Sequence, residues 1–322
     1  MDPVKQIKTL IAKHQTFLIA AHHNPDADAL ASCLAVAVFL KSLGKKVIVA
    51  NEDDVPAWLK FLPQANTAKK VSSLKVKDYD VAIILDCGDR ARIGKVEKLL
   101  IKAKPIINID HHITNDCFGD VNLVVPKASS TCEIVFDLIQ AFKAELNKSL
   151  AVLLYAGIMT DTGSFRYENT SARVHAICGQ LMRFGINAQD LYERLYVGIP
   201  VADMKLFAKV IHEAELLLNG RVYCVMLSHK STATFSKSFD LKDKLFGFLR
   251  SVEGIEVVVI LTEISSKETR INLRSQGSFN VAALAMQFDG GGHVKAAGAK
   301  IYEGLKASKQ IILKAIAKQL KD

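Results

Sequence analysis

Short, uninterrupted apolar runs that alternate with helical patterns constrain the fold of this chain more than any other feature. Such runs are typical of strands buried on both faces. In the first half they lie at residues 17–21, 47–50, 81–86 and 106–110. Residues 30–43 have helical spacing and are followed by Gly44, and further helices are expected at residues 130–142 and 149–159. Strands that alternate with helices in this way predict a parallel sheet flanked by helices.

The alternation pauses between residues 188 and 215, where a helical pattern is broken by Gly198 and Pro200. It then resumes, with strands expected at 222–227, 256–264 and 270–274 and helices at 241–251, 281–288 and 305–320. A chain of 322 residues has about the length of two domains. The sequence therefore predicts an α/β protein with three parts: a larger N-terminal domain (1–187) with a mainly parallel sheet flanked by helices, a helical linker (188–215), and a smaller α/β C-terminal domain (216–322).

Composition excludes some classes of protein. Half of the residues are hydrophobic and 23% are charged, which is not the composition of a disordered chain. No apolar run reaches the roughly 18 residues of a membrane span. The cysteines show no CxxC spacing, and Cys33 and Cys224 lie inside apolar runs, so reduced thiols in the cytoplasm are expected rather than disulfides or zinc ligands. The net charge of +9 favours a polyanionic partner such as a nucleotide, a polyphosphate or a nucleic acid, but solvated surface lysines would give the same value.

Acidic and imidazole side chains follow three of the predicted strands. One strand-end aspartate is commonly a turn former, and Asp28 alone would be interpreted as a helix N-cap. Ligands of a parallel sheet bind outside the carboxyl ends of its strands, so the repeated pattern predicts convergence at one edge. Several carboxylates gathered there would repel one another without cations, which favours a metal site. The candidate ligands are His22, Asp26, Asp28, Asp86, His111 and Asp161, with Asp110 and His112 beside them.

The residue types of this set indicate which metal it binds. Mixed aspartate and histidine ligands without cysteine favour Mn²⁺, with Mg²⁺ or Co²⁺ as substitutes. The set is larger than one octahedral ion needs, and two ions about 3.5–4 Å apart that share a carboxylate explain the surplus. Such a pair activates a bridging water and stabilises the attacking and leaving oxygens. Hydrolysis of a phosphoester or phosphoanhydride is the chemistry expected.

The C-terminal domain carries a possible anion-binding string, DGGGHVKAAGA at residues 289–299. Consecutive glycine N–H groups can form an anion nest, and an arginine can hold phosphate oxygens as a bidentate fork. A plain glycine-rich turn is the alternative. The expected substrate-binding residues are Arg274, Ser275, Gly291, Gly292 and His293.

These motifs together resemble the DHH phosphoesterase superfamily with its DHH-associated C-terminal domain. The resemblance spans almost the whole chain, and its length and layout are most similar to the bifunctional oligoribonucleases and 3′-phosphoadenosine 5′-phosphate phosphatases. Ala31 replaces a glycine common in the family, and because this is a helix position we expect only a packing change. The matching motifs are HHNPDADA at 22–29, Asp86, DHH at 110–112, DTG at 161–163, RS at 274–275, GGGH at 290–293 and AAG at 296–298.

The resemblance implies an activity and a role for each matching residue. Members use Mn²⁺ to release 5′-mononucleotides from very short RNAs and to dephosphorylate 3′-phosphoadenosine 5′-phosphate to AMP. Asp110 would orient an imidazole, His112 would face the scissile phosphate, and closure of the two domains would be needed for catalysis. The implied ligands are His22 and Asp26 for one ion, Asp28, His111 and Asp161 for the other, Asp86 for both, and Arg274 and His293 for the substrate.

Other functions stay open within and outside this superfamily. Relatives that hydrolyse pApA or cyclic di-AMP share the motifs, whereas RecJ-type exonucleases need further domains and family II pyrophosphatases lack the GGGH string. A non-catalytic nucleotide-binding regulator is the alternative from another class, but all six expected metal positions are intact. The expected partners are short RNA oligonucleotides and nucleotides, without a membrane, and a homodimer is compatible with them.

Overall fold

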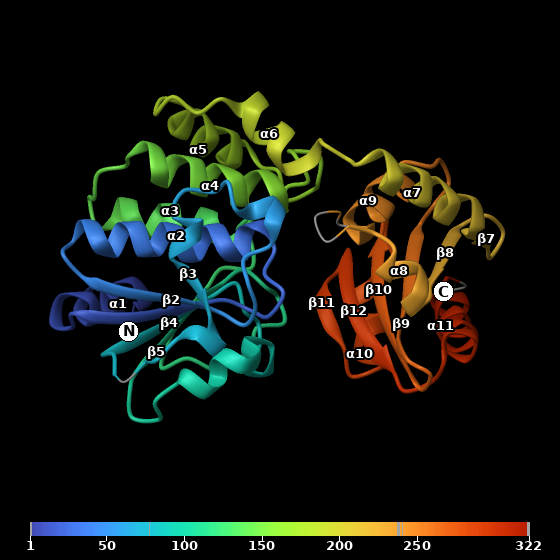
Figure 1. The fold of residues 1–322 in the computed structure, drawn as a ribbon, viewed down its shortest axis with the longest axis horizontal. Coiled ribbons are helices and arrows are strands. Elements are labelled where there is room, and N and C mark those ends of the chain that lie inside the picture. The colour runs from blue at the N-terminus through green and yellow to red at the C-terminus, as the bar shows by residue number, and fades with distance from the viewer. Residues whose placement is uncertain (1, 77, 237–238, 240, 321–322) are drawn as a thin grey trace. The chain divides into compact units, whose positions relative to one another are not determined.

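The computed structural model describes residues 2–76, 78–236, 239 and 241–320 (Figure 1). The chain divides into two compact units, Met1–Val197 and Gly198–Asp322. In the described part of the chain, no helix has both the length and the apolar character needed to span a membrane.

The first unit contains a six-stranded parallel sheet with the strand order β3-β2-β1-β4-β5-β6. Strand β1 pairs with both β2 and β4, so the strand order reverses beside it. In doubly wound sheets, ligands bind at the carboxyl ends of the strands at such a reversal. The strands are β1 (Thr16–Ala20), β2 (Lys46–Asn51), β3 (Ala68–Lys70), β4 (Val81–Leu85), β5 (Ile106–Asp110) and β6 (Val121–Val124).

Both faces of this sheet are covered, which confirms the predicted architecture. Phe17 and Ile19 of β1 belong to one apolar cluster, and Leu18 and Ala20 belong to another on the opposite face. Figure 1 shows α2, α3 and α4 on the same side of the sheet, where they form most of the larger cluster. The helices are α1 (Pro3–Lys13), α2 (Ala27–Ser42), α3 (Thr131–Ala141), α4 (Lys148–Asp161), α5 (Ala172–Met182) and α6 (Ala188–Tyr196), with a 3-10 segment at Arg90–Leu99.

The second unit has a mixed six-stranded sheet with the order β11-β12-β10-β9-β8-β7, in which β8 and β9 pair in parallel. One apolar cluster includes α10 and α11, and a second includes residues of α7 and α9. The strands are β7 (Glu215–Leu217), β8 (Val222–Leu227), β9 (Val257–Ser265), β10 (Glu268–Ser275), β11 (Gly291–His293) and β12 (Ala296–Ile301). The helices are α7 (Val201–Glu213), α8 (His229–Ala233), α9 (Leu241–Leu249), α10 (Val281–Met286) and α11 (Leu305–Gln319).

The predicted linker contains two helices that belong to different units. Helix α6 buries Leu191 and Leu195 in the core of the first unit, whereas α7 buries Val210 in the second. The division falls between Val197 and Gly198, and Pro200 is the N-cap of α7. Each half of the predicted linker therefore packs against its own unit.

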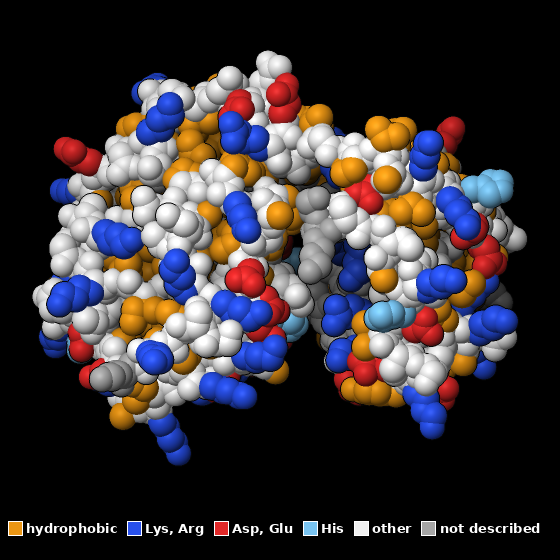
Figure 2. Space-filling view, viewed as in Figure 1, with side chains coloured by type: hydrophobic (Ala, Val, Ile, Leu, Met, Phe, Trp, Pro, Cys, Tyr) orange, Lys and Arg blue, Asp and Glu red, His pale blue; other side chains and the backbone are white. Residues whose placement is uncertain are grey.

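Charged side chains are distributed over the surface of each unit. Figure 2 shows lysine and arginine side chains scattered over the visible face, with acidic side chains between them. Much of the positive charge on this face is therefore solvated surface charge.

Candidate active site

The turn after β1 places His22 and Asp26 at the carboxyl end of the sheet. The side chain of His22 is 6% exposed, and its Nδ1 lies 2.8 Å from the carbonyl oxygen of His23. Asp26 is the N-cap of α2 and accepts a hydrogen bond of 3.0 Å from the N–H of Ala29. Because Asp26 performs this capping, the helix begins at Ala27 rather than at Leu30 as predicted.

Asp28 is therefore not the cap but a buried carboxylate in the first turn of α2. Both of its oxygens accept hydrogen bonds from the first turn of α3. The N–H of Thr131 donates to Oδ2 at 2.7 Å and that of Cys132 donates to Oδ1 at 3.0 Å. The carboxylate is fixed in place by backbone groups about a hundred positions away in the sequence.

Asp86 follows β4 directly and lies at the centre of the site. Its carboxylate is 2% exposed, and its backbone φ of 51° is in the left-handed region that aspartate tolerates better than most residues. Oδ2 lies 3.4 Å from Nε2 of His22, and Oδ1 lies 3.5 Å from Nε2 of His111. The two oxygens therefore face different imidazoles.

The end of β5 supplies two histidines with different partners. Nε2 of His111 lies 3.1 Å from Oδ2 of Asp161, the last residue of α4. Nδ1 of His112 lies 2.6 Å from Oδ1 of Asp110, and Asn115 donates to Oδ2 of Asp110, also at 2.6 Å. The first histidine therefore belongs with the other carboxylates, whereas the second is oriented by Asp110.

Burial and mutual repulsion shift the pKa values of these groups. Burial raises the pKa of Asp28 well above its usual range, and the charges of Asp161 and Asp86 raise it further. Burial also raises the pKa of Asp161, to about 6, against the lowering effect of His111. For Asp86, burial raises the pKa, but the neighbouring imidazoles, chiefly that of His22, lower it by a larger amount. The net shift of its pKa is downward. Crowded buried carboxylates balanced by imidazoles are the donor set of a divalent-cation site.

Two groups that consist of expected ligands share Asp86, which also forms a group with Asp110 and His112. In each group the potential ligand atoms lie within 4.8 Å of one another. Asp161 joins the second group through its contact with His111. The structure thus brings together all six expected metal ligands of the first unit. The groups are His22, Asp26 and Asp86, and Asp28, Asp86 and His111.

In the second unit, both residues of the expected RS motif lie in β10, and their side chains point to opposite faces of the sheet. The guanidinium of Arg274 lies over the ring of Phe246, 4.8 Å from its centroid. The next side chain points to the other face of the strand, so Ser275 is 1% exposed and its hydroxyl donates to the carbonyl of Phe279 at 2.7 Å. The side chain of Ser275 is thus hydrogen-bonded within the second unit, and its expected role in substrate binding stays a prediction.

The glycine run, for which an anion nest is expected, forms part of a strand. Gly291, Gly292 and His293 form β11, which pairs antiparallel with β12. A Cβ on Gly290 would lie 2.6 Å from Cβ of Ala299, so this glycine is required by close packing. The run is a strand that packs tightly on its neighbour, and His293 lies at its end.

Thr131 and Asn115 contact the site but were not predicted from the sequence. Thr131 follows the capping residue Ser130, and its hydroxyl donates to Oδ1 of Asp86 at 3.0 Å. Nothing in the local pattern distinguishes it from an ordinary first-turn residue, and the same is true of Asn115 in its loop.

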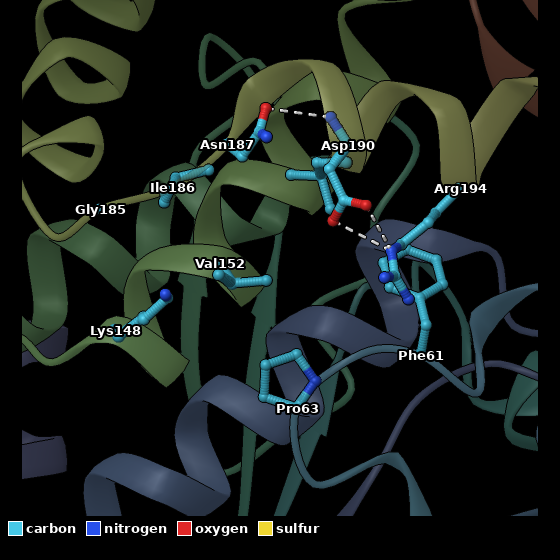
Figure 3. A pocket seen from close by; sticks show the side chains of 10 residues that line it. Phe61, Pro63, Lys148, Val152, Gly185, Ile186, Asn187, Asp190 and Arg194 are labelled. Atoms are coloured by element: carbon cyan, nitrogen blue, oxygen red, sulfur yellow. Dashed lines mark hydrogen bonds and ion pairs between the residues drawn. The ribbon is translucent and has the colours of Figure 1, made fainter.

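A separate cavity of about 310 Å³ lies elsewhere in the first unit (Figure 3). Arg194 and Asp190, one turn apart on α6, line it as an ion pair, with Nε 3.0 Å from both carboxylate oxygens. Phe61 and Val152 contribute apolar wall. None of the clustered aspartates and histidines lines this cavity, so it is distinct from the candidate active site.

Comparison with known proteins gives a consistent assignment. A relative from Thermus thermophilus, named bifunctional oligoribonuclease and PAP phosphatase NrnA, is 31% identical over 304 residues, which cover 94% of this chain and 89% of that protein. A protein of the same name from Bacillus subtilis is 28% identical over 297 residues, which cover 91% of this chain and 91% of that protein. The crystal structure of an exopolyphosphatase-related protein from Bacteroides fragilis superposes with a TM-score of 0.88 at 25% identity, over 98% of this chain and 96% of the other.

The two units correspond to two known domain families. Residues 16–158, which contain the candidate ligands up to His111, match the N-terminal domain of the DHH family. Residues 240–322, which contain Arg274 and the glycine run, match the DHHA1 domain. The chain is therefore a member of the DHH family with a DHHA1 domain in its second unit.

Proposed function

We propose that this protein is a phosphoric ester hydrolase that degrades very short oligoribonucleotides to 5′-mononucleotides and converts 3′-phosphoadenosine 5′-phosphate to AMP. The names of the relatives from Thermus thermophilus and Bacillus subtilis support this pair of activities. The structural observation that carries the proposal is the position of Asp86, whose two oxygens face the imidazoles of two donor groups. A shared carboxylate between two groups of ligands suits a pair of divalent cations.

The proposed cofactor is a pair of Mn²⁺ ions, with Mg²⁺ or Co²⁺ as substitutes, because the donors are carboxylates and imidazoles without a thiolate. When bound, the ions would supply an activated water and positive charge that stabilises the phosphate during hydrolysis. The proposed ligands are His22 and Asp26 for one ion, Asp28, His111 and Asp161 for the other, and Asp86 for both.

Asp110 and Asn115, which lie beside these ligands, would orient the imidazole of His112. Asp110 accepts from Nδ1 of His112 and from the N–H of His111, and Asn115 holds the other carboxylate oxygen. These contacts keep the proton of His112 on Nδ1 and fix the plane of its ring. We therefore assign Nε2 of His112 to the scissile phosphate, where it donates a hydrogen bond to a phosphate oxygen when the ring is protonated.

The second unit would hold the substrate. Arg274 offers a planar fork that suits phosphate oxygens, and its position over Phe246 restricts the rotation of its long side chain. His293 and the backbone of Gly291 and Gly292 are the further proposed contacts. We also propose a cytoplasmic location, which is supported by six free cysteines, five of them buried.

One experiment tests the proposal against its alternatives. Turnover supported by Mn²⁺ is compared, as kcat/KM, for a labelled 2–5-mer RNA, a 24-mer RNA, 3′-phosphoadenosine 5′-phosphate, pApA and cyclic di-AMP. We expect the short RNAs and 3′-phosphoadenosine 5′-phosphate to be the best substrates. A clear preference for pApA or cyclic di-AMP would replace the proposal by the dinucleotide phosphodiesterase, and binding without turnover would indicate a regulator.

A further inference from the structure

The segment that leads into α3 contacts the whole of the second donor group. We call residues 128–132 the α3 entry segment. Thr131 and Cys132 donate their N–H groups to the two oxygens of Asp28, at 2.7 and 3.0 Å. The carbonyl oxygen of Ala128 lies 3.3 Å from Nδ1 of His111. The segment therefore contacts Asp28 and His111, the two residues that belong to the second donor group but not to the first.

Asp161, the remaining proposed ligand of the second ion, is linked to the same segment through the side chain of Asn169. Its Nδ2 donates to the carbonyl oxygen of Ser129 at 3.0 Å and to that of Asp161 at 3.1 Å. The end of α4, which carries Asp161, is thereby connected to the start of α3.

The α3 entry segment is itself held by a capping box. Ser130 accepts from the N–H of Glu133 at 3.1 Å, and the side chain of Glu133 accepts from the N–H of Ser129 at 2.7 Å. Arg173 from α5 donates to the other oxygen of Glu133 at 3.1 Å. These hydrogen bonds hold the backbone of the segment in place, so it is a stable support for its neighbours.

Thr131 is the residue of this segment whose side chain reaches the shared carboxylate. Its hydroxyl donates to Oδ1 of Asp86 at 3.0 Å, the oxygen that faces His111. The other oxygen, Oδ2, faces His22. A hydrogen bond to Oδ1 alone fixes the rotation of the carboxylate, so that one oxygen stays toward each donor group.

We propose that Thr131 is a positioning residue that sets the affinity of the second donor group for its cation more strongly than that of the first. This inference rests on the two-ion site of the proposed function. Partners that orient a metal ligand typically contribute about 10–100-fold to metal affinity. Without the hydroxyl of Thr131, Oδ1 of Asp86 loses its hydrogen bond on the side of the second group, whereas Oδ2 keeps its contact with His22 and the N–H groups that hold Asp28 remain.

The test is a Mn²⁺ titration followed by calorimetry and by electron paramagnetic resonance. Wild type should bind two ions and give the spectrum of an exchange-coupled pair. Thr131→Val should weaken binding of the second ion about 10–100-fold, weaken binding of the first ion much less, and lose the coupled spectrum at limiting Mn²⁺. Thr131→Ser, which keeps the hydroxyl, should restore both. Thr269→Val is the matched control, because Thr269 is equally buried but its hydroxyl donates to the carbonyl of Glu303, in the second unit.

The outcomes separate this inference from the proposed function. A wild-type protein that binds fewer than two ions would overturn the two-ion site and the inference with it. If wild type binds two and Thr131→Val keeps both affinities, or weakens both equally, the inference alone is overturned. Circular dichroism establishes that the variant is folded, and Thr131→Ala replaces it in the titration if valine is not accommodated, with the same expected result.

Discussion

Nδ1 of His112 lies 2.6 Å from Oδ1 of Asp110, and both oxygens of this buried aspartate accept hydrogen bonds. An asparagine side chain has a single acceptor oxygen, so Asp110→Asn cannot accept hydrogen bonds from both His112 and Asn115 in the same geometry. We expect kcat to fall by about 10²–10⁴-fold, the usual contribution of a positioned acid or base. Binding of Mn²⁺ should be unchanged in a titration, because Asp110 is not among the proposed ligands.

Asp116→Asn is the control for this change, because Asp116 is an exposed carboxylate in the loop that follows β5. It should retain wild-type kcat. Wild-type kcat in Asp110→Asn would show that His112 does not need this partner.

Removal of the shared carboxylate should abolish the activity. Asp86→Ala deprives both donor groups of a ligand, and we expect hydrolysis of every substrate to fall by at least about 10³-fold, by analogy with other central electrostatic groups. Metal analysis after gel filtration should show less bound Mn²⁺ than in wild type. Near-wild-type turnover in Mn²⁺ is the result that would exclude the shared-ligand arrangement.

Loss of the guanidinium of Arg274 should affect substrate binding rather than metal binding. Arg274→Ala should reduce kcat/KM on short oligoribonucleotides by the equivalent of about 2–4 kcal/mol, while Mn²⁺ occupancy stays constant. Hydrolysis of bis-p-nitrophenyl phosphate should suffer less, because this small substrate needs little of the proposed grip. Arg270→Ala, four residues earlier on the same strand, is the matched control. Equal losses on both substrates would place Arg274 in the chemical step or in folding.

Gly157 should not tolerate a side chain, because α4 packs closely on the site. A Cβ at this position would overlap Sγ of Cys132 and lie 2.5 Å from Oδ1 of Asp28. Gly157→Ala should lower the free energy of unfolding by about 1–3 kcal/mol, the cost of overpacking. Urea denaturation measures the change.

Gly179→Ala is the contrasting variant, since a Cβ there meets nothing within 4 Å on the exposed face of α5. It should raise the free energy of unfolding by about 0.5–1 kcal/mol, because alanine is the better helix former. Similar effects of the two substitutions would contradict the packing around Gly157.

Asp80 should make the stability of the protein dependent on acid pH. Its carboxylate accepts from the N–H groups of Gln15 and Thr16 and from the hydroxyl of Thr16, and these bonds lower its pKa from 3.8 to about 2. Because the folded pKa lies below the unfolded one, the stabilisation is complete above about pH 4 and is lost as the pH falls toward 2. Urea midpoints between pH 2.5 and 5 should fall more steeply for wild type than for Asp80→Asn.

At neutral pH the same variant should lose about 1 kcal/mol, a modest value because the carboxylate is solvent-accessible. Asp116→Asn serves as the control for loss of one charge. Parallel pH profiles of wild type and Asp80→Asn would show that the hydrogen bonds of Asp80 do not contribute to stability.

The strands that carry the site could be predicted because they are buried on both faces. Strands β4 and β5 are continuous apolar runs, and each is followed by the aspartates and histidines of the site. The edge strands β3 and β6 have short, partly polar sequences and leave no such pattern. For β11 the glycines predicted an anion nest or a turn and not a strand, but residues 291–293 pair with β12.

The contacts that support the site could not be predicted from local patterns. The hydrogen bonds from Thr131 and Cys132 to Asp28 join residues 103 and 104 positions apart. A threonine after a capping serine has the same local sequence whether it supports a metal ligand or faces solvent. Tertiary packing alone makes the difference.

The backbone at Asp86 determines how a substrate complex of this protein could be captured. Its φ of 51° strains most side chains, but asparagine adopts this conformation nearly as readily as aspartate and has almost the same shape. Asp86→Asn would therefore change the charge of the carboxylate with little strain on the strand end, whereas Asp86→Ala would change the backbone preference as well. The asparagine variant is the better choice for soaking an intact dinucleotide into crystals.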